Sequence, residues 1–518
     1  MSTSRSENVA RNSVIGLIMK LINLLLTFVV RTVFISVLGK EYLGINGLFT
    51  NILTILSFTE LGVGNAIVFA MYKPIAQNRM DMVNALMRFY HKCYCAIGSV
   101  ILLIGLCITP FIPKLVSGYT LDLNIYLLFL LYLVNAVVTY FFASRTSFLS
   151  AIQQQYKVDI YQQVVKAVKE ICMGVALILT HNFILYLLIN IILEAMLTLY
   201  IYIRIGQEHP FLKEKTTYVI SKQEYTSIAK NIYALLLYKI ATTVLGGTDN
   251  IIISSCVGLG AVGVLSNYVL IVNNVSNFTT VIGHSVTASI GNLNATDDTS
   301  KKETIFNSLL LVTFWIFGWI TIGMMLFFNQ ALELWIGPEY LFEMPIVFAI
   351  CLNFYVGGLQ TAGYTFRITN GYFRNSRYFP VLNVILNLGL SLYLVDKVGV
   401  FGVLIATPIS RILTTTLVDP FYVYKLSFHK SPSIFYVKYM LLFVLEAVTF
   451  AINYYVLQLI PEIGWAWLGV KVVVCSVITN AIFYLALHKD PDFIYVKESV
   501  FRLFGKVLRR IGRNKYET

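Results

Sequence analysis

The chain has 518 residues, of which 57% are hydrophobic and only 13% are charged, and its mean hydropathy is +0.73. A typical soluble domain carries about 25% charged residues, so this composition excludes an ordinary soluble protein and indicates that much of the surface faces lipid. In a soluble protein the net charge of +13 would suggest a nucleic-acid partner. Here the basic residues cluster between apolar segments, as the positive-inside rule describes, so we expect no nucleic-acid partner.

Seven cysteines lie mostly within apolar runs. Cys93 and Cys95 are the nearest pair, and no second Cys/His cluster accompanies them, so their spacing does not fit a zinc site. We interpret all seven as reduced packing residues and expect neither a metal nor another cofactor.

Apolar segments follow one another along nearly the whole chain. Residues 1–11 are polar, and the apolar run after them is too long for the core of a signal peptide, so we expect it to be the first membrane span. A span needs about 20 predominantly apolar residues. The segment at 160–180 fits this criterion least well, because Lys166, Lys169 and Glu170 lie in its first half. The pattern predicts an all-α integral membrane protein with about fourteen transmembrane helices, at residues 12–35, 45–70, 91–111, 121–143, 160–180, 183–204, 231–255, 262–290, 305–328, 343–365, 378–396, 399–422, 437–459 and 465–487.

The distribution of Lys and Arg between these segments predicts their orientation. With the N-terminus placed inside, 29 basic residues fall on the inner side and 3 on the outer side. Basic inner connections alternate with outer connections poor in Lys and Arg at every predicted span. We therefore expect an even number of spans and both termini in the cytoplasm. The outer connections are short, and no sizeable soluble domain is expected on either side.

The C-terminal residues 491–513 have the pattern of a basic amphipathic helix. Phe493, Val496, Val500, Phe504 and Leu508 recur near helical spacing among Lys and Arg. Such a helix would lie on an anionic inner leaflet. A merely solvated tail is the alternative.

The chain matches itself at an offset of 219 residues. Asn12 then meets Asn231, Lys20 meets Lys239, and glycines 39, 44 and 64 meet glycines 258, 263 and 283. A lysine inside two apolar helices is rarer than a chance apolar match, so we interpret the offset as a duplication of six helices with the same orientation. This predicts two lobes related by a pseudo-twofold axis along the membrane normal, with a substrate path between them. The expected division is 1–220 for the first lobe, 221–430 for the second, 431–490 for an extra helix pair and 491–518 for the tail.

Several stretches resemble the polysaccharide flippases of the MOP superfamily, the Wzx-type transporters of bacterial surface-polysaccharide assembly. They read YLGINGLF at 42–49, TELGVGNA at 59–66, MYKPIA at 71–76, TDNIIIS at 248–254 and SNY at 266–268. The resemblance covers nearly the whole chain. It implies a V-shaped pair of lobes in the bacterial cytoplasmic membrane that alternates between inward-open and outward-open states.

The same resemblance implies the cargo and the partners. The cargo would be an undecaprenyl-diphosphate-linked oligosaccharide that moves from the inner to the outer leaflet. A coupling ion, H⁺ or Na⁺, and polysaccharide polymerase or other assembly proteins are the partners it suggests.

Two lysines and a glutamate are candidates for the substrate cavity. Lys20 lies about 12 Å from the inner end of its helix, too deep to reach the headgroups easily. Glu60 lies at a matching depth in the next segment, and Lys239 is the repeat counterpart of Lys20. One interpretation is a cavity cation with its counter-ion, and the other is a structural ion pair. An ionised group at mid-bilayer costs roughly 2.5–3.5 kcal/mol, so it needs a partner or a wet cavity in either case.

Arg31 and Asp249 lie a few residues from the outer ends of two repeat-related segments. Across a pseudo-twofold axis they would form an ion pair at an outer gate. Separate contact of each with the outer headgroups is the alternative.

Further polar residues lie within apolar segments. Arg411 follows Pro408, where a helix can bend and open a polar seam, and Glu194 and Glu446 also lie in mid-segment. Amides such as Asn267 and Asn274 suit sugar hydroxyls, because each offers donors and an acceptor, but they also serve as contacts between helices. His284 is interpreted as a packed polar residue rather than a proton carrier. The segment at 262–290 is unusually polar and contains Asn267, Asn273, Asn274, Ser276, Asn277 and His284.

Three other functions compete with the flippase. A cation-coupled exporter of the MATE type should favour anionic groups in its cavity, whereas Lys20 and Lys239 favour an anionic cargo. A lipid II flippase would share the basic cavity. A membrane-embedded polymerase or glycosyltransferase would need a long extracytoplasmic loop, which the sequence lacks, so we expect no enzyme. No GxxxxGK[ST] motif is present either, so we do not expect the chain to bind ATP through a P-loop.

Overall fold

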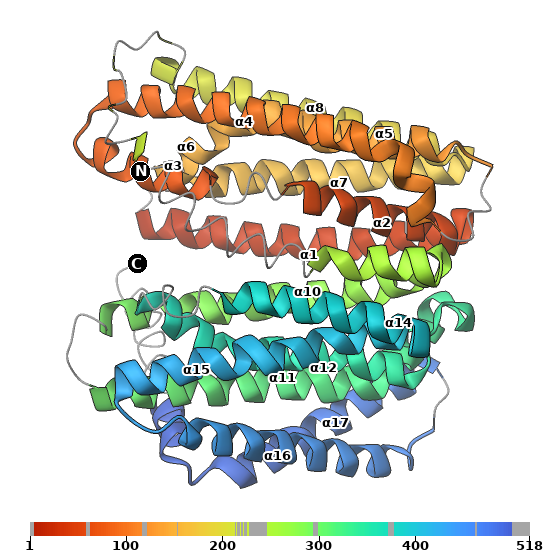
Figure 1. Cartoon of the computed structure of the whole chain (residues 1–518), viewed down its shortest axis with the longest axis vertical. Helices are drawn as coiled ribbons and strands as arrows, with labels where there is room; N and C mark the ends of the chain where they lie inside the picture. Colours follow the sequence, from red (N-terminus) through yellow and green to blue (C-terminus); the bar gives the residue numbers. More distant parts are fainter. Residues whose placement is uncertain are drawn as a thin grey trace, which may run out of the picture. The chain divides into compact units, whose positions relative to one another are not determined.

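The structure is a computed structural model, and its described part is helical without a strand (Figure 1). Two compact units, Met1–Ser266 and Asn267–Thr518, divide the chain. We call them unit 1 and unit 2 and describe each by itself. The described residues are 5–57, 63–116, 122–152, 154–212, 214, 218, 221, 225–226, 246–293, 299–370, 378–461 and 464–499.

Unit 1 is built from long helices joined by short connections. Helix α1 packs along α7, α4 packs along α5, and α5 packs along α8. Gly39, with φ of 84°, makes the turn between α1 and α2. The side chain of Asn182 caps α8 by accepting hydrogen bonds from the amides of Ile184 and Leu185. Its elements are α1 (Arg5–Leu38), α2 (Lys40–Leu56), α3 (Val63–Ala76), α4 (Met80–Ile108), η2 (Thr109–Leu115), α5 (Ile125–Phe142), η3 (Ala143–Arg145), α6 (Thr146–Ala151), α7 (Gln155–Thr180), α8 (Phe183–Glu208) and η4 (Pro210–Leu212), followed by helical residues 246–256.

Unit 2 begins within α10 (Leu259–Leu293), whose first turns belong to unit 1. Helix α14 bends at Val398 and Gly399, where Gly399 has φ of 58°. Two π-helical turns, η6 and η7, flank α15, and such turns are frequent at functional sites. The other elements are α11 (Thr299–Ile336), η5 (Pro338–Tyr340), α12 (Met344–Thr369), α14 (Phe379–Arg411), η6 (Ile412–Thr416), α15 (Leu417–Val423), η7 (Tyr424–Phe428), α16 (Ser433–Leu457) and α17 (Gly464–Leu487).

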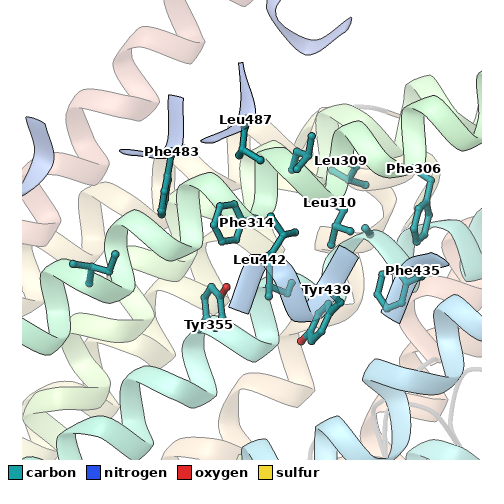
Figure 2. Packing of buried hydrophobic residues seen from close by; sticks show 14 of the residues in the cluster. Phe306, Leu309, Leu310, Phe314, Tyr355, Phe435, Tyr439, Leu442, Phe483 and Leu487 are labelled. Carbon is teal, nitrogen blue, oxygen red and sulfur yellow. The ribbon is translucent and has the colours of Figure 1, made fainter. Parts of the chain in front are cut away.

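An aromatic core holds α11, α12, α16 and α17 of unit 2 together. Figure 2 shows Phe314 of α11 with Leu442 of α16 and Phe483 of α17. Phe314 and Phe483 stand 4.8 Å apart between ring centroids. Aromatic pairs of this kind stabilise packing by about 0.5–1.5 kcal/mol beyond their buried area. The two C-terminal helices are therefore an integral part of the unit 2 core.

The helices confirm the predicted all-α membrane fold. Ten helices of the described part are long and apolar enough to cross a membrane, and the one that runs from Phe379 to Phe428 contains two predicted segments on either side of its bend. The doubtful segment at 160–180 is helical within α7. The predicted segment at 45–70 corresponds to α2 and α3, with residues 58–62 outside the described part. Most of the segment at 231–255 also lies outside it.

The predicted amphipathic tail begins as a helix at residues 491–499. Its first turn is packed on unit 2, because Phe493 stacks on Trp315 with ring centroids 5.3 Å apart. Lys438 forms ion pairs with Asp492 at 2.8 Å and with Asp490 at 3.4 Å. Binding of the tail to a membrane surface stays a prediction, since the remaining residues lie outside the described part.

Candidate functional site

The lysine–glutamate cluster predicted for the cavity is described only in part. Lys20 lies in the middle of α1 with an exposed side chain. Glu60 and Lys239 lie outside the described residues, so the Lys20–Glu60 pair and the approach of Lys20 to Lys239 stay predictions.

Arg31 and Asp249 both belong to unit 1 and are half-buried. The guanidinium of Arg31 donates a hydrogen bond to the hydroxyl of Ser266, at the start of α10. Asp249 lies in the helical residues 246–256. The Arg31–Asp249 gate pair stays a prediction, and Ser266 is a partner of Arg31 that the sequence did not indicate.

Contacts between α2 and the first turns of α10 repeat themselves at the offset of 219 residues, all inside unit 1. A Cβ on Gly44 would collide with the backbone carbonyl of Leu259, and a Cβ on Gly263 would collide with the backbone carbonyl of Lys40. Leu259 and Gly263 are the repeat counterparts of Lys40 and Gly44, so the second contact is the first with the two copies exchanged. Such reciprocity is typical of an isologous contact about a twofold axis, and it supports the internal repeat.

A second reciprocal pair lies beside this crossing. Arg31 bonds to Ser266, and a Cβ on Gly47 would stand 3.8 Å from Nδ2 of Asn250. Asn250 and Ser266 are the repeat counterparts of Arg31 and Gly47. The two equivalent pairs, Arg31 with Ser266 and Asn250 with Gly47, therefore lie at corresponding places in the two copies. Only the first copy has a positive charge there, because Arg31 corresponds to Asn250.

The polar residues of α10 have different surroundings, since Asn273 and Asn277 are exposed and Asn267 is buried. Asn267 is fully buried in unit 2. Asn274 donates from Nδ2 to the carbonyl of Leu270 at 2.8 Å, inside its own helix. Tyr268, which the sequence did not single out, donates to Oδ1 of Asn329 at 2.6 Å and accepts from the amide of Phe342 at 2.9 Å. The described hydrogen bond to a neighbouring helix is therefore that of Tyr268 with α11, and a role of the asparagines toward sugars or toward other helices stays a prediction. The side chain of His284 lies outside the described part.

Arg411 ends α14 directly before the π-helical turn η6. Its Nη1 lies against α12, 2.8 Å from the position that a Cβ of Gly357 would occupy. Pro408 lies inside the same helix, as expected from the sequence. Asn387 lies before the bend of α14 and Thr407 lies after it, and Nδ2 of Asn387 donates to the hydroxyl of Thr407 at 2.9 Å. Arg411 lies one turn beyond Thr407 on this helix, and both the polar seam and its role toward a cargo stay predictions.

The two mid-segment glutamates have different surroundings. Glu194 of α8 forms an ion pair with Lys169 of α7 at 2.8 Å. This pair gives one charge of the segment at 160–180 a partner, but α7 is not among the ten helices that are apolar enough to cross a membrane, so its span stays a prediction. Glu446 of α16 is 8% exposed, and its carboxylate lies against Gly318 of α11. Any side chain at position 318 would collide with this carboxylate, so the glycine makes room for it.

A buried ion pair in unit 2 escaped the interpretation of the sequence. Arg367 of α12 lies 3.3 Å from Asp419 of α15, and their side chains are 3% and 0% exposed. Gly363 makes room for it, since a Cβ there would meet the Cβ of Asp419 at 3.2 Å. The available signal was an aspartate directly before Pro420 in an otherwise apolar run. Arg367 gave no signal, because it lies where an inner-side basic residue is expected.

Comparisons with known proteins found a matching family and similar folds. The family model described as "Polysaccharide biosynthesis protein" matches residues 9–288. The fold is similar to that of the lipid II flippase MurJ in an inward closed conformation, with a TM-score of 0.69 and 14% identity over 92% of this chain and 100% of that one. None of the curated proteins matches the sequence.

Multidrug resistance transporters of the MATE family, from the MOP superfamily, have a similar fold. An inward-facing structure gives a TM-score of 0.61 with 15% identity, over 77% of this chain and 92% of that one. An outward-facing structure gives 0.56 with 15% identity, over 79% and 93%. At these identities the likeness shows the fold, which is that of multi-pass membrane transporters.

Proposed function

This chain belongs to the polysaccharide biosynthesis protein family, and we propose that it is a flippase for undecaprenyl-diphosphate-linked oligosaccharides. It would move them from the inner to the outer leaflet of the bacterial cytoplasmic membrane for surface-polysaccharide assembly. The family match over residues 9–288 is the observation that carries this proposal. The likeness of the whole fold to a lipid II flippase supports it, because both cargoes would be sugars on a lipid diphosphate.

The chemistry of the cargo explains why cations inside membrane helices matter. A diphosphate carries at least two negative charges and cannot cross hydrocarbon without fixed cations to replace its water. Lys20 is exposed in the middle of α1, and an ionised side chain at that depth is costly unless a wet path reaches it. Lys20 and its repeat counterpart Lys239 are our candidates for carrying the diphosphate, with Arg31, Glu60, Asp249, Asn267, Asn274 and Arg411 as further candidates along the path.

The proposal includes an arrangement of the chain in the membrane. Residues 1–220 and 221–430 would form the two lobes, 431–490 the extra helix pair and 491–518 a cytoplasmic tail. Both termini would lie in the cytoplasm, as the 29 to 3 excess of inner basic residues favours. Transport would alternate between inward-open and outward-open states, driven by H⁺ or Na⁺ or by consumption of the cargo outside, with polysaccharide polymerase and other assembly proteins acting next.

A transport assay with three cargoes tests the proposal. The purified chain is reconstituted into vesicles with a fluorescent undecaprenyl-diphosphate oligosaccharide, and a membrane-impermeant quencher reports its leaflet. We expect faster exchange between leaflets than in protein-free vesicles. Lipid II as the preferred cargo would favour the peptidoglycan flippase, and movement of a cationic dye alone would favour the exporter.

A second measurement uses the cell. Loss of the gene should leave a lipid-linked oligosaccharide on the inner leaflet, and its sugar composition would identify the cargo. A membrane-embedded polymerase would give a different result, because unpolymerised repeat units would then accumulate on the outer leaflet.

A further inference from the structure

A pocket of about 240 Å³ opens in unit 1 between α4, η3 and α8. Its floor includes Met87 and Leu212, which are 5% and 8% exposed. Its walls include Arg88, His91 and Lys92 of α4 and Arg145 of η3. The pocket lies at the end of these helices where the basic residues predict the cytoplasm.

The basic side chains of α4 stand on one face of the helix. Arg88, His91 and Lys92 are spaced three and four residues apart, so they lie side by side along the pocket. Like charges at this spacing destabilise a helix, and Arg145 adds a third permanent charge from the opposite wall. The positive-inside rule accounts for basic residues at this end of the helices, but it does not account for their convergence on one pocket.

None of the described ion pairs offsets these charges. No Asp or Glu lines the pocket, and no described ion pair involves Arg88, Lys92 or Arg145. The acidic Glu208, at the same end of α8, is already paired with Lys157 at 3.2 Å and with Arg204 at 3.3 Å. The lining described for the pocket therefore contains basic side chains and no acidic one.

The cationic groups are held in place rather than left to move with solvent. The guanidinium of Arg145 lies 3.7 Å from the centre of the Tyr202 ring and donates to the Tyr202 carbonyl at 2.8 Å. His91 Nδ1 is 3.2 Å from the hydroxyl of the buried Ser144. Arg88 donates to the carbonyl of Glu214, beyond η4. Such fixed donors lower the cost of ordering a ligand.

We propose that this pocket is a binding site for a phosphate or diphosphate group. Arginine forks and a lysine ammonium around a small cavity are the donors that phosphate oxygens select. The group could belong to an inner-leaflet lipid or to a soluble phosphorylated molecule of the cytoplasm, since both present the same oxygens. The site lies wholly within unit 1, and the proposal does not rest on the flippase function.

The test measures binding to the full-length chain in a neutral detergent. Pyrophosphate is titrated by calorimetry, and retention of phosphatidic acid against phosphatidylcholine is measured by native mass spectrometry. The variant is Arg88→Gln with Lys92→Gln, at two exposed positions. Its folding is checked by thermal denaturation, because Arg88 also donates to the carbonyl of Glu214. The control is Lys73→Gln, an exposed lysine in the last turn of α3 that does not line the pocket.

We expect the double variant to weaken binding about tenfold or more, because each lost charge-assisted hydrogen bond matters at that scale. The control should bind as the native chain does. Binding of pyrophosphate without selective retention of phosphatidic acid would identify a soluble ligand as the source. Selective retention of phosphatidic acid that the double variant weakens and that excess pyrophosphate displaces would identify a lipid. Absence of both, or equal losses in the variant and in the control, would overturn the proposal.

Discussion

The charged side chains of unit 2 and unit 1 differ in how far they are exposed. In unit 2 the Arg367–Asp419 pair is almost completely buried, at 3% and 0% exposure. In unit 1 the Lys169–Glu194 pair keeps 19% and 28% exposure, and Lys20 is exposed. A buried charge whose partner is removed destabilises a protein strongly, whereas an accessible one can exchange its partner for water or a ligand.

This difference separates structural charges from charges that can meet a cargo. The buried pair of unit 2 fixes α12 against α15 next to the π-helical turns, and no anion can reach it without breaking it. The accessible cations of unit 1 can respond to a ligand. We therefore expect substitutions in the buried Arg367–Asp419 pair of unit 2 to act on stability and substitutions of the accessible cations of unit 1 to act on transport or binding.

The largest expected effect is on transport. Lys20→Ala and Lys239→Ala should each lower flipping at least about tenfold, because each removes a charge-assisted contact with the diphosphate. Lys20→Arg should retain activity, and Lys73→Ala serves as the control for loss of one positive charge. The vesicle assay measures the rate, and membrane insertion is checked separately. Normal transport in both alanine variants would remove these lysines from the mechanism.

The next effect is on stability. Asp419→Ala should lower the free energy of unfolding by about 3–5 kcal/mol, because it leaves Arg367 buried without its partner. The double variant Arg367→Met with Asp419→Leu should recover most of that loss, since an apolar pair of similar volume needs no desolvation of charge. Denaturation in detergent measures both. If the double variant were as unstable as the single one, the pair would not act as a unit.

A third prediction compares the same substitution in the two units. Gly44→Ala should cost about 1–3 kcal/mol, because the new Cβ meets the backbone of Leu259. Gly389→Ala in α14 is the control, since nothing lies within 4 Å of the position of its Cβ. There the helix propensity of alanine should stabilise the chain by up to about 1 kcal/mol. Equal effects at the two positions would mean that the crossing of α2 and α10 is not tight.

The smallest effect concerns the partly exposed ion pair of unit 1. A double-mutant cycle with Lys169→Met and Glu194→Gln should give a coupling energy of about 1 kcal/mol or less, because both groups keep access to solvent or headgroups. A matching cycle with Arg367→Met and Asp419→Leu, each alone and together, gives the coupling energy of the buried pair. The difference between the two coupling energies is the sharpest test of the contrast between the units. A coupling energy as large as that of the buried pair would show that both units use their charges for structure.

The fold was predictable from the sequence because lipid restricts the choices. Apolar length alone identified the helices, and the α7 segment was found in spite of Lys166, Lys169 and Glu170. Its partner could not be deduced, because the Lys169–Glu194 contact depends on how α7 rotates against α8. The bend at Gly399 was marked by a gap between two predicted segments, but the π-helical turns have no simple sequence pattern.

The candidate sites were less predictable, because they join residues far apart in the chain. The pocket of Arg88 and Arg145 was counted only as inner-side basic charge, since the positive-inside rule explains any lysine or arginine in a cytoplasmic connection. Asp419 was overlooked inside an apolar run. Both omissions have one cause: composition gives the side of the membrane on which a charge lies, but tertiary packing decides what it faces.

A protein made of one copy of the 219-residue repeat would carry both the glycine now at 44 and the residue now at 40. In the present chain the glycine of each copy lies against the backbone of the other copy's residue 40 or its counterpart 259. Two such molecules could associate face to face as a symmetric homodimer, each glycine against the other's backbone. Gene fusion would then have freed the copies to diverge. On the predicted duplication, Arg31 and its repeat counterpart Asn250 would be one product of that divergence, and the proposed cargo, with its single charged end, would have use for such asymmetry.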